Sequence, residues 1–285
     1  MKRGLILPNW VAGEDVELLV EAAVVAADAG WDGVFLADHL VFPPPSEVGS
    51  GDRPFDDMAM PDPWITHAAI AARTERILLG SWVTPVGRRQ PWQLARDLAT
   101  LDRLSGGRVL LAVGLGRRSD HEPFGTPWDL HAVARRTDAA LELLDGFWRG
   151  EPVHHRGEHF EVDDVTLLPR PVQRPRIPVV VGGLWPHRAV VRRGVRWDGI
   201  APHFPGDGVL PGDETPPERH LRALVAAYHE EAAEPGEVMV LDDPPAAGDD
   251  WRDLAAEVGV TWLLTAKHDG EWRIDLDEIA EGPPG

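Results

Sequence analysis

The sequence is poorest in sulfur and in phenol side chains: among 285 residues it has no cysteine, one tyrosine and four methionines. Without cysteine the chain cannot form a disulfide, offer a thiolate nucleophile or hold a cysteine-ligated zinc or iron–sulfur site. It also begins without a long hydrophobic run, since the apolar stretch that starts at Gly4 stops at Pro8. That stretch is too short for a signal peptide or a membrane span, so we expect a soluble, cytoplasmic protein.

Positive charge is also scarce, with 28 lysines and arginines against 47 aspartates and glutamates and a formal net charge of −19. Such a chain repels nucleic acid and anionic membranes, and its basic residues are scattered along the sequence. We therefore expect a small-molecule substrate as its partner, and neither nucleic acid nor membrane. Tryptophan is the abundant aromatic residue, with twelve copies. Some lie near expected strand ends or loops, where flat rings could line a pocket: Trp10, Trp82, Trp128 and Trp185.

Short apolar segments alternate with amphipathic helical patterns along the whole chain. The eight expected strands are Gly4–Pro8, Gly33–Ala37, Ile77–Val83, Val109–Val113, Val179–Val181, Gly199–Ala201, Val238–Leu241 and Thr261–Thr265. This alternation predicts an α/β fold of the (β/α)₈ TIM barrel type, formed by residues 1–285 as one domain. We also expect an inserted hairpin near 153–162 and a frayed, acidic tail after residue 279.

In such a barrel the active site lies at the carboxyl ends of the strands. Asp38 and His39 follow the expected strand Gly33–Ala37 directly. Together they offer a hydrogen-bond acceptor and a side chain of the type that titrates near neutrality. The alternative is that Asp38 only caps the loop and His39 packs on a neighbouring ring.

A second candidate site lies where the expected strand Val179–Val181 ends in two glycines, Gly182 and Gly183, and a helix begins near Pro186. Free amides on a glycine turn and at a helix N-terminus favour a phosphate group, and Arg188 could add positive charge. The alternative is an ordinary connection between a strand and a helix.

Two other patterns are poor candidates. His154, His155 and His159 lie in the expected hairpin, where alternation places them on different faces, so we expect no metal site. Asp242 and Asp243 lack a matching carboxylate at the end of the fourth strand, so a glycosidase pair is incomplete.

The longest informative stretch runs from Arg76 to Gly116. It contains G-S-W-V-T-P, R-R-Q-P, L-A-R-D-L-A-T-L-D-R-L-S-G-G-R and V-G-L-G in that order. Further on, P-V-Q-R-P-R-I-P-V-V-V-G-G is followed by R-W-D-G-I-A-P. By these motifs the chain resembles the luciferase-like monooxygenases, which use a flavin or a deazaflavin. The resemblance extends to about Phe204, and the last 80 or so residues resemble the family only in pattern.

The resemblance implies roles for particular residues. His39 would be the catalytic residue, and Asp38 would lie beside the cofactor ring. Ser81 and Trp82 would lie at a bulge that carries a cis peptide bond, at Ser81–Trp82 or at Trp82–Val83. The residues implied at the cofactor phosphate are Gly114, Gly116, Gly182, Gly183 and Leu184, with Arg117 or Arg118 as the cation.

The resemblance also implies an oxidoreductase, with two possible chemistries. With reduced FMN and oxygen the protein would be a monooxygenase, and a separate flavin reductase would be its partner. With the deazaflavin coenzyme F-420 (F420) it would transfer a hydride to or from a small organic substrate. The alternatives are a non-catalytic flavin-binding protein on the same barrel and a cofactor-free barrel hydrolase. The substrate depends on the loops 42–60, 117–130 and 202–216.

Two expected helices, Pro63–Arg73 and Pro91–Leu104, carry more apolar residues than one barrel-facing stripe requires. The residues concerned are Trp64, Ile65, Ala68, Ala69, Ile70, Trp92 and Leu94. Members of the resembled family commonly pair through this side of the barrel, so we expect a homodimer. The alternative is that the long loops cover these positions.

Overall fold

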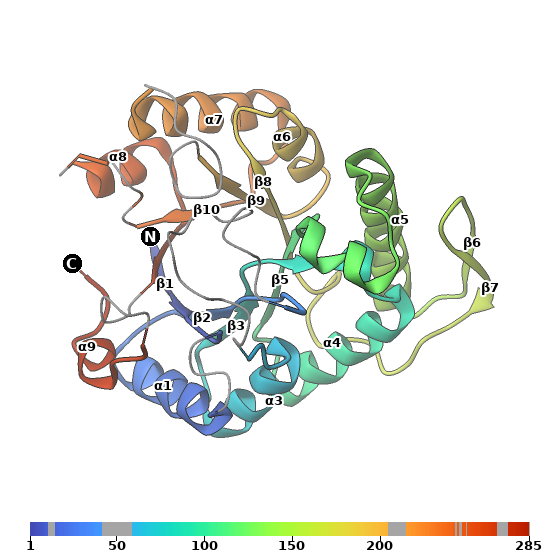
Figure 1. The fold of residues 1–285 in the computed structure, drawn as a ribbon, viewed down its shortest axis with the longest axis horizontal. Coiled ribbons are helices and arrows are strands. Elements are labelled where there is room, and N and C mark those ends of the chain that lie inside the picture. The colour runs from blue at the N-terminus through green and yellow to red at the C-terminus, as the bar shows by residue number, and fades with distance from the viewer. Residues whose placement is uncertain are drawn as a thin grey trace.

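The structure is a computed structural model that describes residues 1–10, 15–41, 59–204, 215–242, 244, 247–248, 250–266 and 273–284. Its centre is a closed barrel of eight parallel strands (Figure 1). The barrel strands are β1 (Lys2–Leu7), β2 (Gly33–Leu36), β3 (Leu78–Ser81), β5 (Val109–Gly114), β8 (Val179–Leu184), β9 (Gly199–His203), β10 (Glu237–Leu241) and β11 (Trp262–Ala266). Neighbours follow the order β3, β2, β1, β11, β10, β9, β8, β5, and the pairing of β3 with β5 closes the ring. The predicted (β/α)₈ barrel is confirmed.

Helices surround this barrel on the outside, as Figure 1 shows. They are α1 (Val16–Asp28), α3 (Pro63–Arg73), α4 (Pro91–Ser105), α5 (Leu130–Arg149), α6 (Ala189–Gly194), α7 (Pro217–Glu231), α8 (Trp251–Val258) and α9 (Leu276–Ala280). Local signals set their ends. The Asp62 carboxylate accepts hydrogen bonds from the first amides of α3, and Gly106, with φ of 73°, ends α4 in the left-handed conformation. No helix in the described ranges is long and apolar enough to cross a membrane.

Large side chains fill the inside of the barrel. The rings of Phe35 and Trp262 meet edge to face with their centroids 5.7 Å apart, and neither side chain reaches solvent. Gly4 and Gly80 leave room for Phe35, because a Cβ atom on either glycine would lie within 2.6 Å of its ring. A ligand therefore has no space in the middle of the barrel, and the mouth at the carboxyl ends of the strands is the place left for a site.

The third barrel strand is interrupted. β3 ends at Ser81, the Trp82–Val83 peptide bond is cis, and a two-residue strand, β4 (Thr84–Pro85), then pairs with β5. The expected strand Ile77–Val83 is thus shorter than the sequence suggested. The cis bond lies at the second of the two expected positions.

Two segments lie outside the barrel. β6 (Val153–Arg156) and β7 (Glu161–Val165) pair antiparallel, and Figure 1 shows this hairpin standing off from the barrel beyond α4 and α5. The segment after residue 279, which we expected to be frayed, follows a docked helix. Ile279 is fully buried, its carbonyl accepts a hydrogen bond from the Trp31 indole, and Gly282 lies against the backbone of Ala29.

Candidate active site

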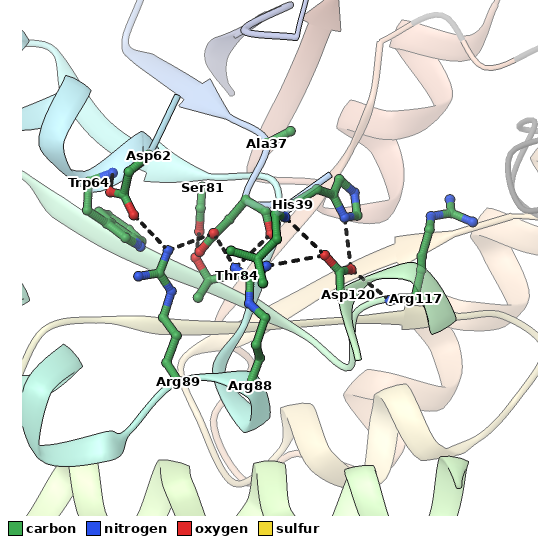
Figure 2. A network of polar contacts seen from close by, with 12 residues as sticks. Ala37, His39, Asp62, Trp64, Ser81, Thr84, Arg88, Arg89, Arg117 and Asp120 are labelled. Atoms are coloured by element: carbon green, nitrogen blue, oxygen red, sulfur yellow. Dashed lines mark hydrogen bonds and ion pairs between the residues drawn. The ribbon is translucent and has the colours of Figure 1, made fainter. Parts of the chain in front are cut away.

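His39 lies at the barrel mouth and is paired with a carboxylate from a distant loop. His39 follows the end of β2, while Asp120 ends a short 3₁₀ turn, Arg118–Asp120, that follows β5. The imidazole Nδ1 lies 2.9 Å from Asp120 Oδ2. The His39 side chain is 20% exposed to solvent, whereas the Asp120 side chain is fully buried. Figure 2 shows the two side chains turned toward each other.

Asp120 is surrounded by hydrogen-bond donors. Its Oδ2 also accepts from the Arg117 amide at 2.9 Å, and its Oδ1 accepts from Arg88 Nη1 at 3.2 Å and from the Leu40 amide at 3.3 Å. Burial raises the pKa of Asp120. The hydrogen bond and charge of His39, the Arg117 amide and the Arg88 guanidinium lower it more, so the pKa lies below its usual value. Asp120 is therefore an ionised acceptor.

This environment decides which nitrogen of His39 carries the proton. An ionised carboxylate can only accept, so the His39 Nδ1 must donate to it. In the neutral ring Nε2 is then the unprotonated nitrogen. Nε2 has no hydrogen-bond partner among the described residues. The geometry therefore leaves one basic atom of the ring available for a ligand at the mouth.

Asp38 is buried in an arginine clamp next to this pair. Its Oδ1 accepts from Arg88 Nη2 at 2.6 Å and from Arg89 Nη2 at 2.7 Å, and Arg89 reaches on to Asp62 Oδ2 at 3.1 Å (Figure 2). Its Oδ2 is buried and has no partner in the part of the chain that the structure describes. A buried carboxylate oxygen without a donor is costly, so it suits a ligand that brings an N–H or O–H group.

The charges in this network are unequal. Three carboxylates, of Asp38, Asp62 and Asp120, face two guanidinium groups, of Arg88 and Arg89. The network therefore carries one net negative charge when His39 is neutral, and a proton on His39 would cancel it.

The bulge after β3 lies beside this network. The Ser81 hydroxyl donates to Ala112 O at 3.1 Å and accepts from Thr84 Oγ1 at 2.9 Å, so it is already engaged inside the protein. The Trp82 ring is half-buried, with its centroid 5.7 Å from that of His203. The Ser81 side chain thus supports the bulge from within, while the Trp82 ring is partly open to solvent.

Val83, at the end of the bulge, is accommodated by two glycines. A Cβ atom on Gly114 would overlap Val83 Cγ2, and one on Gly182 would lie 3.3 Å from Val83 Cγ1. Gly116 has its own reason: its φ is +81°, and a Cβ there would lie 2.9 Å from Pro85 Cβ. Three of the four glycines expected at a phosphate, Gly114, Gly116 and Gly182, are therefore needed by the bulge and by the turn that holds Asp120.

The expectation of a glycine turn directly after residue 181 is wrong. β8 continues through Leu184, and Gly182, Gly183 and Leu184 pair with Ala201, Pro202 and His203 of β9. A Cβ on Gly183 would lie 3.0 Å from Val190 Cβ, so this glycine brings α6 close to the sheet. The following helix begins only at residue 189 and has six residues.

The expected cations are engaged in different ways. Arg118 pairs with Glu122 at 2.8 Å on the surface, and Arg188 pairs with Glu231 at 3.5 Å. Arg117 uses its backbone amide to hold Asp120, and Figure 2 shows its side chain pointing away from that carboxylate.

Two of the tryptophans expected near a pocket have other contacts. Trp128 packs on His121, while Trp185 is buried in the core beside α6.

Several positions that follow expected strands in the sequence lie outside the described residues. These are most of the loop 42–60, residues 205–214 of the loop 202–216, Asp243, and residues 267–272 after β11. Asp242 points into a structural cluster, where Arg3, Arg252 and Thr265 donate to its carboxylate.

A model of the luciferase-like monooxygenases matches residues 1–240. The chain belongs to the luciferase-like monooxygenase family. An F420-dependent glucose-6-phosphate dehydrogenase of Microbacterium testaceum is 34% identical over 170 residues, which cover 59% of this chain and 47% of the relative. The chain thus spans about half the length of the relatives of this kind that it matches.

Two solved structures with a similar fold carry different cofactors. An F420-dependent secondary alcohol dehydrogenase with an F420–acetone adduct has a TM-score of 0.75 and 17% identity, over 98% of this chain and 96% of that one. The oxygenating component of a Pseudomonas putida diketocamphane monooxygenase, with FMN, has a TM-score of 0.66 and 18% identity, over 85% and 66%. At these identities the likeness shows the fold alone. The M. testaceum relative is named as F420-dependent, and the two structural neighbours hold an F420 adduct and FMN.

Sequence reasoning singled out His39 and Asp38 as candidates but missed the side chains that contact them. Asp120 lies 81 residues from His39, in a loop read only as a connection. Arg88 and Arg89 were noted as part of a family motif without a role. Two adjacent arginines just after a barrel strand, with aspartates in the segments that follow β2 and β5, were the available signal.

Proposed function

We propose that the protein is a deazaflavin-dependent oxidoreductase that transfers a hydride between F420 and a carbon bearing a hydroxyl or carbonyl group in a small organic substrate. His39 is its acid–base residue. The observation that carries this proposal is the His39–Asp120 pair, which leaves a basic Nε2 at the barrel mouth. Oxidation of a hydroxyl group needs such a base, because the O–H proton must leave together with the hydride.

The residues at the mouth fit a flat cofactor ring. Asp38 Oδ2 is a buried acceptor that lacks a donor, and a flavin-like ring carries N–H groups. Val83 of the bulge lies over Gly114 and Gly182 at the same mouth, where β3, β5 and β8 end. We therefore keep the set Asp38, Ser81, Trp82, Gly114, Gly116, Gly182, Gly183 and Leu184 in the proposed cofactor site, with Ser81 acting through its main chain.

Each residue then has a definite task. The site would hold F420, which would supply the acceptor or donor of the hydride. His39 Nε2 takes the hydroxyl proton when the substrate is oxidised and returns it in the reverse direction. Arg88 and Arg89 hold Asp38 in place, and the filled barrel interior keeps the reacting groups at the mouth.

The choice of F420 over FMN rests on sequence similarity. The M. testaceum relative and a Mycobacterium tuberculosis hydroxymycolic acid dehydrogenase, at 34% and 32% identity, are both named as F420-dependent. FMN or a modified FMN is named for structural neighbours at 18% and 22% identity. With FMN the protein would instead be a monooxygenase and would need reduced flavin from a separate reductase.

Cofactor titrations test the proposal first. We expect F420 to quench the protein's tryptophan fluorescence stoichiometrically, whereas FMN binds weakly or not at all. F420 reduction is then followed by its absorbance with a panel of primary alcohols, secondary alcohols and sugars. Turnover with reduced FMN and oxygen would contradict the proposal, and so would tight F420 binding without turnover on any substrate, which indicates a non-catalytic binding protein.

A variant of the proposed base tests its role. We expect His39→Ala to lower turnover by about 10²-fold or more while F420 affinity stays nearly unchanged, because the ring moves a proton and does not anchor the cofactor. His131→Ala, at an exposed position on α5, is the matched control and should behave as wild type. Wild-type turnover in the His39 variant would remove this residue from the mechanism.

A further inference from the structure

His39 can act as a base only if its ring is fixed in the right orientation and tautomer. A free imidazole has two tautomers and rotates about its side-chain bonds, so either nitrogen could face the substrate. Among the described residues, Asp120 is the group that contacts the ring nitrogen Nδ1, at 2.9 Å. What fixes Asp120 therefore fixes the base.

Asp120 is itself held from three directions. Arg88 reaches it from the turn after β4, the Leu40 amide from the end of β2, and the Arg117 amide from its own turn. The turn is closed in the other direction as well, because the Asp120 amide donates to Arg117 O at 3.0 Å. The carboxylate thus has little freedom to move, and its side chain has no solvent exposure.

The approach to this turn is also constrained. Gly116 precedes it with a φ of +81°, a conformation that side chains other than hydrogen rarely adopt. A Cβ atom there would lie 3.1 Å from Asp120 Oδ2 and 2.9 Å from Pro85. The V-G-L-G motif that marked the end of the fourth expected strand therefore serves to place Asp120 against His39.

We propose that Asp120 is the positioning residue of the reaction: it holds the proton on His39 Nδ1, keeps Nε2 basic and stabilises the charged ring that proton transfer produces. The inference rests on the proposed function for the identity of the reaction. In the oxidative direction the substrate O–H bond breaks and its proton goes to Nε2, while the C–H electron pair leaves as hydride to F420. The substrate C–O bond becomes C=O. Asp120 takes no proton at any stage.

The surrounding charges agree with this role. The network of Asp38, Asp62, Asp120, Arg88 and Arg89 carries one net negative charge before the reaction and none once His39 is protonated. The same carboxylate could instead serve only to join three loops. A purely structural role predicts lost stability with no effect on the ring of His39, so the tautomer of that ring separates the two.

The first measurement needs no cofactor. In protein labelled with ¹⁵N at histidine, the ring signals of His39 are identified among the twelve histidines by their loss in His39→Ala. We expect the neutral wild-type ring to carry its proton on Nδ1, and Asp120→Asn to move a large part of the population to the Nε2–H tautomer. Both oxygens of Asp120 accept hydrogen bonds. An asparagine side chain has one oxygen and one NH₂ group, so its NH₂ group would face donors on one side and could not accept from them. A wild-type ring protonated on Nε2 would overturn the proposal without any variant.

A matched control and kinetics complete the test. Glu122→Gln removes a carboxylate two residues away that pairs with Arg118 on the surface, and should leave the His39 signals and turnover unchanged. Asp120→Asn should lower kcat by about 10²-fold or more with F420 affinity nearly unchanged. Added to His39→Ala, it should cost no further turnover, because both act through one ring.

The same variants distinguish failure of the Asp120 proposal from failure of the proposed function. If the losses of Asp120→Asn and His39→Ala multiply in the double variant, Asp120 does not act through His39 and the proposal falls. If His39→Ala is fully active while the tautomer result holds, the proposed function falls and the Asp120–His39 coupling stands. Asp120→Glu, which keeps the charge, replaces the asparagine variant if the latter does not fold, and should retain the Nδ1–H tautomer.

Discussion

At the scale of single residues, His67 is a second buried histidine with a different task. It lies on α3, is fully buried, and its Nε2 lies 2.7 Å from Gly80 O, to which it donates. Burial lowers its pKa from 6.5 to about 4, and the hydrogen bond to Gly80 and the charge of Asp62 oppose this only in part. His67 is therefore a neutral structural residue that holds β3 just before the bulge.

This pKa predicts a pH dependence of stability. Because the folded-state pKa is below the unfolded one, the unfolded chain binds the extra proton first as the pH falls. The stabilisation is complete above about pH 6.5 and is lost between there and pH 4, by about 3 kcal/mol. We expect His67→Gln, which keeps a donor for Gly80, to lose this dependence, measured by urea unfolding at pH 7, 5.5 and 4. His131→Gln is the exposed control, and equal pH slopes in wild type and His67→Gln would contradict the assignment.

The contrast between His39 and His67 shows how far residue-level prediction reaches. Both are histidines close to a buried strand, and the sequence marked only His39, because it follows a strand end next to an aspartate. The partner of His39 could not be derived, since Asp120 meets it only when the ends of β2 and β5 converge at the mouth. Hydrogen bonds between loops 81 residues apart follow from the closed barrel and not from local pattern.

At the scale of elements, the bulge after β3 depends on the absence of side chains opposite it. A Cβ on Gly114 would overlap Val83, so we expect Gly114→Ala to destabilise the protein by about 1–3 kcal/mol and to weaken F420 binding. Val83→Ala removes the overlapping methyl groups and should restore most of the loss when combined with it. Denaturant unfolding and F420 titration of the two single variants and the double variant measure this coupling. Additive losses would show that Val83 and Gly114 are independent.

Elements were predicted well where the signal is local and less well where it depends on a neighbour. The helix caps at Asp62 and Gly106 are encoded by adjacent residues, and those helix ends are as expected. Gly182 and Gly183 suggested a turn because glycines often end strands. Pairing with β9 keeps them in β8, and the space for Gly183 is set by Val190. A valine at position 183 would therefore clash with Val190 and disturb the packing of α6. Weaker cofactor binding in such a variant would not by itself show a phosphate site at Gly183.

At the scale of the whole molecule, alternation of strands and helices was enough to predict the barrel, because parallel strands need crossover helices and eight of them close a ring. The apolar residues on α3 and α4 that we expected to need a second surface divide into two groups. Trp64, Ile70 and Leu94 are buried in the core, whereas Ile65, Trp92 and Leu104 remain 74%, 39% and 55% exposed. The salt bridge of Arg89 with Asp62, at 3.1 Å, joins the N-terminal ends of the two helices, so Ile65 and Trp92 belong to neighbouring elements.

We therefore keep the homodimer as a prediction, with an interface centred on Ile65 and Trp92. Sedimentation equilibrium at micromolar concentration should give twice the chain mass of 31.3 kDa. Because each chain carries a net charge of −19, association should strengthen as salt rises from about 50 to about 300 mM and screens the repulsion. Ile65→Glu should give monomers, because the dimer interface would have to bury the new carboxylate of each chain. Leu130→Glu, at a position 53% exposed on α5 and away from this interface, should leave the dimer intact. A wild-type species at 31.3 kDa would show that these apolar side chains remain in water.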